Sequence, residues 1–172
     1  MADSNLFTVK LVTPERILLD GPAAEVILRT GDGDITILDG HTPVVGSVEP
    51  GVVRVVRDGG DVERVAVHGG FLQVEQHAPA EPGEDAGGAA TGGTRVTLLV
   101  GVAELAEEID SQRARTALEA AEAKVAELNA GGRGTGAADE EEPDADLAEA
   151  EASELRARVR LEAVEATSTS PV

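Results

Sequence analysis

The sequence predicts an α+β protein in which an antiparallel β-sandwich of about ten strands precedes a two-helix arm. Short runs of β-branched and aliphatic residues, separated by turn residues, fill residues 5–100, and the apolar period then changes from two to about 3.6. The net charge also changes, from −6 over residues 1–76 to −13 over residues 77–172. We therefore expect a sandwich domain over residues 1–101 and a helical arm over residues 102–172.

The strands are predicted from period-two alternation and from the turns between them. Apolar and more polar residues alternate from Phe7 to Val12, and a short strand at residues 17–19 should close at the turn sequence Asp20-Gly21-Pro22. Asp58-Gly59-Gly60-Asp61 predicts a hairpin, since glycine adopts the positive φ that tight turns require. The other expected strands cover residues 25–29, 34–38, 44–48, 51–57, 62–68, 71–76 and 95–100.

Three segments have the composition of chain that cannot bury enough apolar surface to order itself. Residues 77–94 are Pro, Gly, Ala, Thr, acids and one His, and predict a disordered loop inserted between two strands. Residues 129–146 are rich in Gly, Ala and acids and predict a flexible acidic linker. Residues 167–172 predict a disordered tail.

Two helices are expected in the arm. The first should begin after Asp110, a residue type that caps helix N-termini, and run to Asn129, and the second should cover residues 147–166. Their apolar stripes are mostly Ala, so at about 25 cal/mol per Å² they offer little stabilisation, and the arm should exchange easily between packings. The expected stripes are Ala114, Leu118, Ala121, Val125 and Leu128, then Ala148, Ala152, Leu155, Val159, Ala163 and Ala166.

Composition excludes several classes of function. The only aromatic residues are Phe7 and Phe71, which leaves no stacking platform for single-stranded nucleic acid, and a charge of −19 disfavours phosphate backbones. There is no cysteine for thiolate catalysis or disulfides. The N-terminus is unlike a secretory signal, and no run approaches the roughly 20 apolar residues of a membrane span. We expect no nucleic-acid partner and no insertion into lipid.

Catalytic and metal-binding motifs are not recognisable in the chain, so we predict no catalytic residue, no metal site and no resident cofactor. One alternative is a stand-alone calcium- or ligand-binding β-sandwich, because Asp32, Asp34 and Asp39 are spaced somewhat like a calcium loop. The glycine and final Glu of an EF-hand are misplaced, however. A hydrolase built on Ser47 and His68 rests on residue type alone.

Five short motifs carry a family resemblance. They are Gly40-His41-x-Pro43, Pro50-Gly51 before a Val-rich strand, Gly69-Gly70-Phe71-Leu72-x-Val74, Val96-Thr97-Leu98-Leu99 and Ile109-Asp110-Ser111-Gln112-Arg113-Ala114. In order, in spacing and in their strand-then-helix layout they resemble the epsilon subunit of F-type ATP synthases. The resemblance covers roughly residues 5–166.

The resemblance implies a non-catalytic rotor subunit of the central stalk, which couples proton translocation through the c-ring to ATP synthesis. The implied partners are the gamma subunit and the c-ring for the sandwich, and the alpha and beta subunits for the helical arm when it extends. In that position the arm would inhibit ATP hydrolysis. The implied location is peripheral, on the cytoplasmic face of the bacterial cell membrane.

The resemblance also implies roles for particular residues. Asp32 and Asp34 would face the basic polar loops of the c-ring, although both residue types are also ordinary in turns. Gly40, His41 and Pro43 would belong to the gamma-facing surface, although His41 is equally a candidate structural histidine of the turn.

A third set of residues matches a motif that binds ATP as a regulatory ligand in some members of the family. A guanidinium near a helix N-terminus can meet a phosphate there. The alternative is that Asp110 acts only as an N-cap and that the arginines of the second helix pair with nearby Glu. The candidate residues are Ile109, Asp110, Arg113, Ala114, Arg156 and Arg160.

Overall fold

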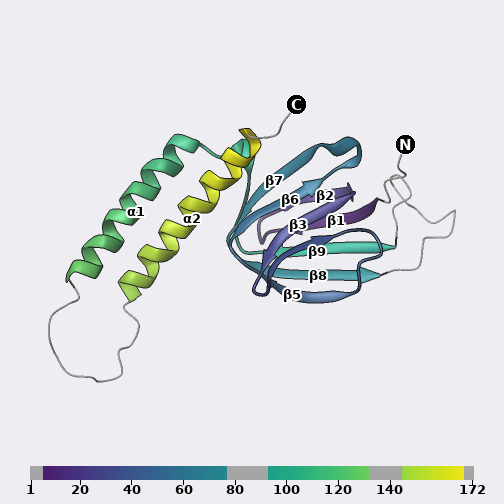
Figure 1. Cartoon of the computed structure of the whole chain (residues 1–172), viewed down its shortest axis with the longest axis horizontal. Coiled ribbons are helices and arrows are strands. Elements are labelled where there is room, and N and C mark those ends of the chain that lie inside the picture. The colour runs from purple at the N-terminus through teal and green to yellow at the C-terminus, as the bar shows by residue number, and fades with distance from the viewer. Residues whose placement is uncertain (1–5, 77–92, 132–144, 169–172) are drawn as a thin grey trace, which may run out of the picture. The chain divides into compact units, whose positions relative to one another are not determined.

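The computed structural model describes residues 6–76, 93–131 and 145–168 (Figure 1). They form two compact units, Met1–Ala106 and Glu107–Val172. The first is a β-sandwich and the second a pair of helices, which confirms the predicted α+β class. The boundary follows residue 106 rather than 101, because the chain forms one further strand after Val100.

The sandwich has ten strands in the described part of the chain, joined in the order β10-β7-β6-β3-β5-β8-β9-β1-β2, with β4 paired to β3. Two 3-10 turns, η1 (Asp58–Gly60) and η2 (Ala106–Glu108), follow β6 and β10. The strands are β1 (Phe7–Val12), β2 (Ile17–Ala23), β3 (Glu25–Thr30), β4 (Gly33–Ile37), β5 (Val44–Val48), β6 (Gly51–Val56), β7 (Val62–Val67), β8 (Gly70–Gln76), β9 (Thr94–Val100) and β10 (Ala103–Leu105).

Strand β2 is longer than the sequence suggested. It continues through Asp20-Gly21-Pro22, and these residues pair with β1 in the register Lys10↔Asp20, Val9↔Gly21 and Thr8↔Pro22. Because β2 lies at the end of the strand order, the missing N–H of Pro22 can face the unpaired side of the strand. Gly21 accommodates a φ of +143°, so turn-forming residues here extend a strand instead of ending it.

One strand pair departs from the expected antiparallel arrangement. Strand β1 pairs with β9 in parallel, with Val9 opposite Val96 and Leu11 opposite Leu98, while the other ladders are antiparallel. Parallel neighbours need a long connection, and the chain from β1 to β9 supplies one. Local alternation cannot reveal such a distant pairing.

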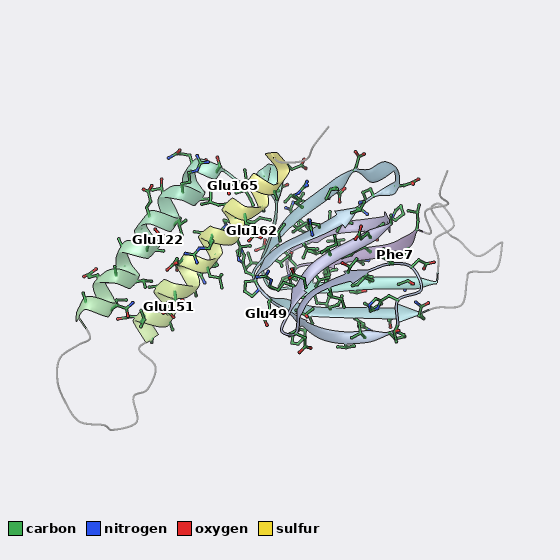
Figure 2. All side chains as sticks on the ribbon, in the orientation of Figure 1. Phe7, Glu49, Glu122, Glu151, Glu162 and Glu165 are labelled. Carbon is green, nitrogen blue, oxygen red and sulfur yellow. The ribbon has the colours of Figure 1, made fainter. Side chains whose placement is uncertain are left out.

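The core consists almost entirely of aliphatic side chains from the inward positions of the strands. Phe7, Val9 and Leu11 of β1 are fully buried, and the buried row continues from Leu11 to Leu98 of β9 and Leu72 of β8. Phe7 is the one aromatic residue of this core (Figure 2). The other, Phe71, is 64% exposed on β8.

The second unit is a hairpin of α1 (Ser111–Gly131) and α2 (Ala145–Ser168), which pack along each other. Asp110 caps α1 as predicted, because its Oδ1 accepts the backbone N–H of Gln112 at 2.9 Å and of Arg113 at 3.0 Å. The predicted stripe of α1 is confirmed, since its five residues are buried or half-buried while the rest of the helix from Gln112 to Ala130 is exposed.

The predicted stripe of α2 is wrong at two positions, because Ala148 is exposed and Leu155 is 41% exposed. The other four predicted positions are buried or half-buried, and so is a second set of positions spaced alternately by three and four residues, the pattern of a coiled-coil seam. Arg158 flanks this seam, and its Nη2 lies 3.8 Å from Oε1 of Glu122 on α1. The seam residues are Leu147, Ala150, Glu154, Ala157, Leu161 and Val164.

Most of the predicted loop, linker and tail lies outside the described residues. The described parts of those segments are ordered: Thr94 begins β9, residues 129–131 end α1, and residues 145–146 begin α2. Neither described helix contains an apolar stretch long enough to cross a bilayer.

The two phenylalanines provide a matched test of the core. Phe7→Ala should lower the free energy of unfolding by about 3–5 kcal/mol, because it leaves a cavity among buried aliphatic side chains. Phe71→Ala should change it by about 0.5 kcal/mol or less, because that ring lies on the surface. Urea denaturation followed by circular dichroism measures both, and equal losses would contradict the assigned core.

The helix cap can be tested in the same way. Asp110→Ala should destabilise the hairpin by about 1 kcal/mol, since two backbone N–H groups lose their acceptor, while Asp110→Asn should retain most of the stability. Helical ellipticity followed during thermal unfolding reports the difference. Equal loss in both variants would indicate that the charge, and not the hydrogen bonds, stabilises this end.

Candidate functional site

The turn between β3 and β4 carries the two acidic residues predicted to face the c-ring. The Thr30 hydroxyl donates to the carbonyl of Gly33 at 2.9 Å and closes the turn, and Asp32 is exposed at its tip. Asp34 lies opposite Arg29, whose Nε donates to Asp34 Oδ1 at 3.0 Å. Both side chains of this ion pair are more than half exposed, so it contributes at most about 1 kcal/mol and can be exchanged for a partner's charge.

A hollow of about 310 Å³ adjoins this turn, between β4 and β5. Residues 30–35 and 44–47 line it together with Leu72 of the core, so it combines two carboxylates, Asp32 and Asp34, with aliphatic side chains such as Val44. A long cationic side chain fits such a surface, because its methylene stem can contact the aliphatic part while its charge meets a carboxylate.

The turn between β4 and β5 contains the three residues predicted to face gamma. Gly40 has a φ of +81°, which favours glycine, and its N–H donates to Thr94 Oγ1 at 2.8 Å. His41 is half-buried, and its Nδ1 lies 2.8 Å from the carbonyl oxygen of Thr42. Because a carbonyl only accepts, Nδ1 carries the hydrogen in this contact. Pro43 is exposed beside it.

Thr94 was not singled out by the sequence, yet it connects this turn to the neighbouring strands. Its side chain is 1% exposed, and its hydroxyl donates to Asp39 Oδ1 at 2.8 Å. The amide nitrogen of Gln76 donates to Thr94 Oγ1 at 2.9 Å and to the carbonyl of His41 at 2.7 Å. Gln76 and Thr94 flank the compositionally distinct residues 77–92, and that position is the signal that could have identified them.

The residues predicted to bind ATP are only partly brought together. Asp110 and Arg113 are exposed at the start of α1, Ile109 is half-buried, and Ala114 is buried in the seam. Oδ1 of Asp110 is already the acceptor of the helix cap. The cap and the proposed ligand contact therefore share one carboxylate.

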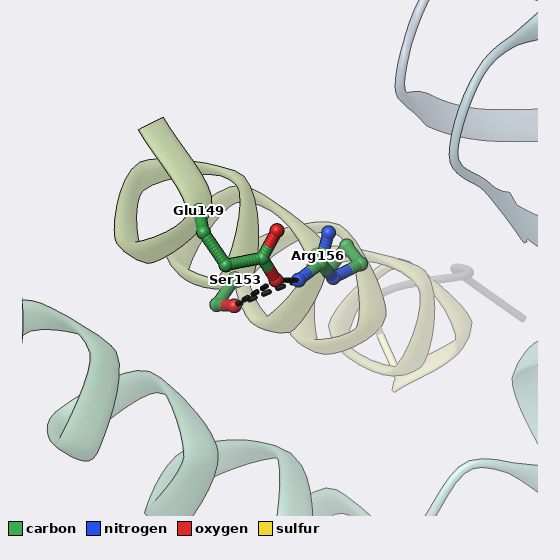
Figure 3. A network of polar contacts seen from close by, with 3 residues as sticks. All are labelled: Glu149, Ser153 and Arg156. Carbon is green, nitrogen blue, oxygen red and sulfur yellow. Dashed lines mark hydrogen bonds and ion pairs between the residues drawn. The ribbon is translucent and has the colours of Figure 1, made fainter. Parts of the chain in front are cut away.

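The two arginines of α2 lie farther along the hairpin. Arg158 of α2 lies near Glu122 of α1, so these two residues mark one height along the antiparallel helices. At a rise of about 1.5 Å per residue, Arg160 lies about 10 Å along the hairpin axis from Arg113, and Arg156 about 16 Å. Nη2 of Arg156 donates to Glu149 Oε1 at 2.8 Å and to Ser153 Oγ at 2.7 Å (Figure 3). Arg156 thus pairs with a Glu of its own helix, as the alternative expected, and that partner is Glu149, one heptad earlier.

The calcium-binding alternative is not supported. Asp34 is paired with Arg29, and Asp39 accepts the hydroxyl of Thr94. Among the described residues, no three His, Cys, Asp or Glu side chains gather as a metal site would require. Asp34 and Asp39 therefore have different partners in different turns, and their spacing in the sequence does not correspond to a calcium loop.

A surface feature that the sequence analysis did not identify crosses the outer face of the sheet β5-β8-β9-β1-β2. The register places Phe71 opposite Leu99, Leu99 opposite Val12, and Val12 opposite Ile17. These four residues alternate with core residues and thus point outward, and Phe71, Leu99 and Ile17 are each about half exposed or more. Val45 on β5, 74% exposed, lies one row away. We call Val12, Ile17, Phe71 and Leu99, together with the adjacent Val45, the apolar row.

Comparison with known proteins gives a consistent match. The family model described as "ATP synthase, Delta/Epsilon chain, beta-sandwich domain" matches residues 6–78. An ATP synthase epsilon chain of Thermobifida fusca is 46% identical over 125 residues, covering 71% of this chain and 79% of that protein. One from Microcystis aeruginosa is 36% identical over 124 residues, covering 72% and 77% respectively.

Solved structures share the fold. A chain in the cryo-EM structure of the Euglena gracilis mitochondrial ATP synthase, OSCP/F1/c-ring, aligns with a TM-score of 0.59 and 24% identity, covering 95% of this chain and 80% of that one. A chain in the Tetrahymena thermophila mitochondrial ATP synthase central stalk/c-ring aligns with a TM-score of 0.50 and 14% identity, covering 92% and 96%. Because the relatives are 36–46% identical over more than two thirds of the chain, the conclusion is that it belongs to the ATP synthase epsilon chain family and is a non-catalytic subunit of the synthase.

Proposed function

We propose that this chain is the rotor subunit that joins gamma to the c-ring and so couples proton translocation to ATP synthesis. Membership of the epsilon chain family supports the rotor role, and the synthase to which the family belongs is a membrane-associated complex. We place the chain at the cytoplasmic face of the bacterial cell membrane as a peripheral subunit. The single observation that carries the proposed docking is the apolar row on one face of the sandwich.

The apolar row is the proposed gamma surface. Burying a Val, Leu, Ile or Phe side chain contributes about 1.5–3 kcal/mol, and aromatic residues are frequent anchors of protein interfaces. From Phe71 on β8 the row continues across β9, β1 and β2, which gives a partner one extended surface. The turn with Gly40, His41 and Pro43 leads directly into β5 of the same sheet, so we assign it to the same interface.

The β3–β4 turn is the proposed c-ring surface. Asp32 is exposed at the tip, and the hollow beside it has the mixed acidic and aliphatic lining that suits Arg or Lys. Basic polar loops would therefore find charge-assisted partners in Asp32 and, by displacing Arg29, in Asp34. The hollow and the apolar row meet at β5, because Val45 belongs to both, so the two partners would occupy adjoining surfaces of the sandwich.

The hairpin is proposed to be a regulatory arm that inhibits ATP hydrolysis when it extends toward alpha and beta. Its seam contains Ala114, Ala121, Ala150 and Ala157, so little apolar area holds the helices together. ATP is the proposed ligand of the folded hairpin, bound by Ile109, Asp110, Arg113 and Ala114. Arg160 is better placed to join that group than Arg156, which lies farther along α2 and is paired with Glu149.

The gamma surface is tested by changing an exposed residue that the fold does not need. Phe71→Glu should weaken binding to purified gamma at least tenfold, because a charge would be buried against an apolar partner. Gln73→Ala, two residues along the same face of β8, is the control and should bind nearly as the unaltered chain does. Titration calorimetry measures both, and unchanged affinity for Phe71→Glu would remove the apolar row from the interface.

The arm is tested by truncation at the boundary that the structure gives. A chain ending at Ala106 keeps β10 paired with β7 and should raise ATP hydrolysis by the reconstituted complex. A chain ending at Val102 loses β10 and should also be less stable. Hydrolysis rates with the full chain and with the Ala106 truncation decide the question, and equal rates would contradict an inhibitory arm.

Partners can be identified without assuming any of these contacts. The tagged full chain should recover alpha, beta, gamma and c subunits from detergent-solubilised membranes of its host, as mass spectrometry would show. Recovery of the folded chain alone would contradict the proposed assembly.

A further inference from the structure

The β4–β5 turn is held by one buried hydroxyl. Thr94 uses its full hydrogen-bonding capacity, since its hydroxyl donates to Asp39 Oδ1 and accepts from the Gly40 N–H and from the Gln76 side-chain amide. The three distances lie between 2.8 and 2.9 Å. Thr94 is also the one buried polar residue of the described chain. A fully satisfied buried group of this kind fixes a single conformation of its surroundings.

The second bond of Gln76 extends this arrangement to His41. The Gln76 amide nitrogen donates to the His41 carbonyl at 2.7 Å as well as to Thr94. The backbone on both sides of Gly40 is thereby tied to the paired ends of β8 and β9. With the backbone fixed, the Nδ1 contact of His41 with the Thr42 carbonyl sets the direction of the imidazole ring.

We propose that Thr94 is a positioning residue, which holds the Asp39–His41 turn in the conformation that presents His41 and Pro43 to gamma. The gamma contact itself rests on the proposed function; the hold on the turn rests on the hydrogen bonds alone. Residues 76 and 94 are the cross-strand pair at which β8 ends and β9 begins, on either side of residues 77–92. The shape of the gamma-facing turn therefore depends on that pair staying closed.

The test compares substitutions that keep and remove the hydroxyl. Thr94→Val has nearly the same shape but leaves the Asp39 carboxylate, the Gly40 N–H and the Gln76 amide without this partner. It should shift the backbone amide NMR signals of Gly40 and His41 and weaken binding to gamma about tenfold. Thr94→Ser should restore both. Thr36→Val on exposed β4 is the control for the same exchange at a site outside the turn.

These readouts separate positioning from simple stability. A merely structural Thr94 would lower the unfolding temperature in the Val variant and shift the Gly40 signal through the lost hydrogen bond, but leave the gamma affinity unchanged at 25 °C, and that unchanged affinity would overturn the proposal. Should Thr94→Val fail to fold, Gln76→Met serves instead, because Gln76 is exposed and its exchange removes the bonds to Thr94 and His41.

Failure of the gamma contact is detected separately. His41→Ala leaves the bonds of Thr94 in place, so its gamma affinity reports on the contact alone. Weakened binding supports the contact. Unchanged binding of His41→Ala and of Pro43→Ala would overturn the gamma assignment of this turn, and with it the part of the proposal that concerns gamma, whatever the NMR signals of Thr94→Val show.

Discussion

The scarcity of aromatic side chains is the constraint on which the sandwich depends. With Phe7 as the one buried aromatic side chain of the described residues, the interior must be filled by Val, Leu and Ile from the inward positions of the strands. Each strand is therefore tied to one register, because a slip of one residue would turn its aliphatic set outward. The same alternation places Phe71 and Leu99 on the outside, so the positions of the apolar row follow from the period-two pattern that builds the core.

The sequence predicted the features that depend on neighbours in the chain. Alternation located most strands, Asp110 located the start of α1, and a single apolar stripe located its packed face, because Leu118, Val125 and Leu128 stand out among charges. In α2 the alanines occur on every side, so the seam depends on the register with α1, which no local pattern contains. The parallel β1–β9 pair and the extension of β2 also depend on distant partners.

The candidate site shows the same division. Asp32, Asp34, Gly40 and His41 could be named from their motifs, but their surroundings could not. Arg29 is found beside Asp34 through strand register, and Thr94 reaches the β4–β5 turn across more than fifty residues of chain. The composition of residues 77–92 could have drawn attention to Thr94, but only the topology shows which turn it supports. The acidic residues of the arm, among them Glu122, Glu151, Glu162 and Glu165, are by contrast visible in the sequence itself (Figure 2).

The parallel ladder between β1 and β9 also limits how the protein can be made. The first strand lies between β2, which is synthesised soon after it, and β9, which is synthesised some ninety residues later. During translation the core face of Phe7, Val9 and Leu11 stays incomplete until β9 has left the ribosome. Contacts of such long range slow folding, because the chain between them must be closed first. The sandwich should therefore close late and as one unit, and the nascent chain is most exposed to misassociation just before residue 100 emerges.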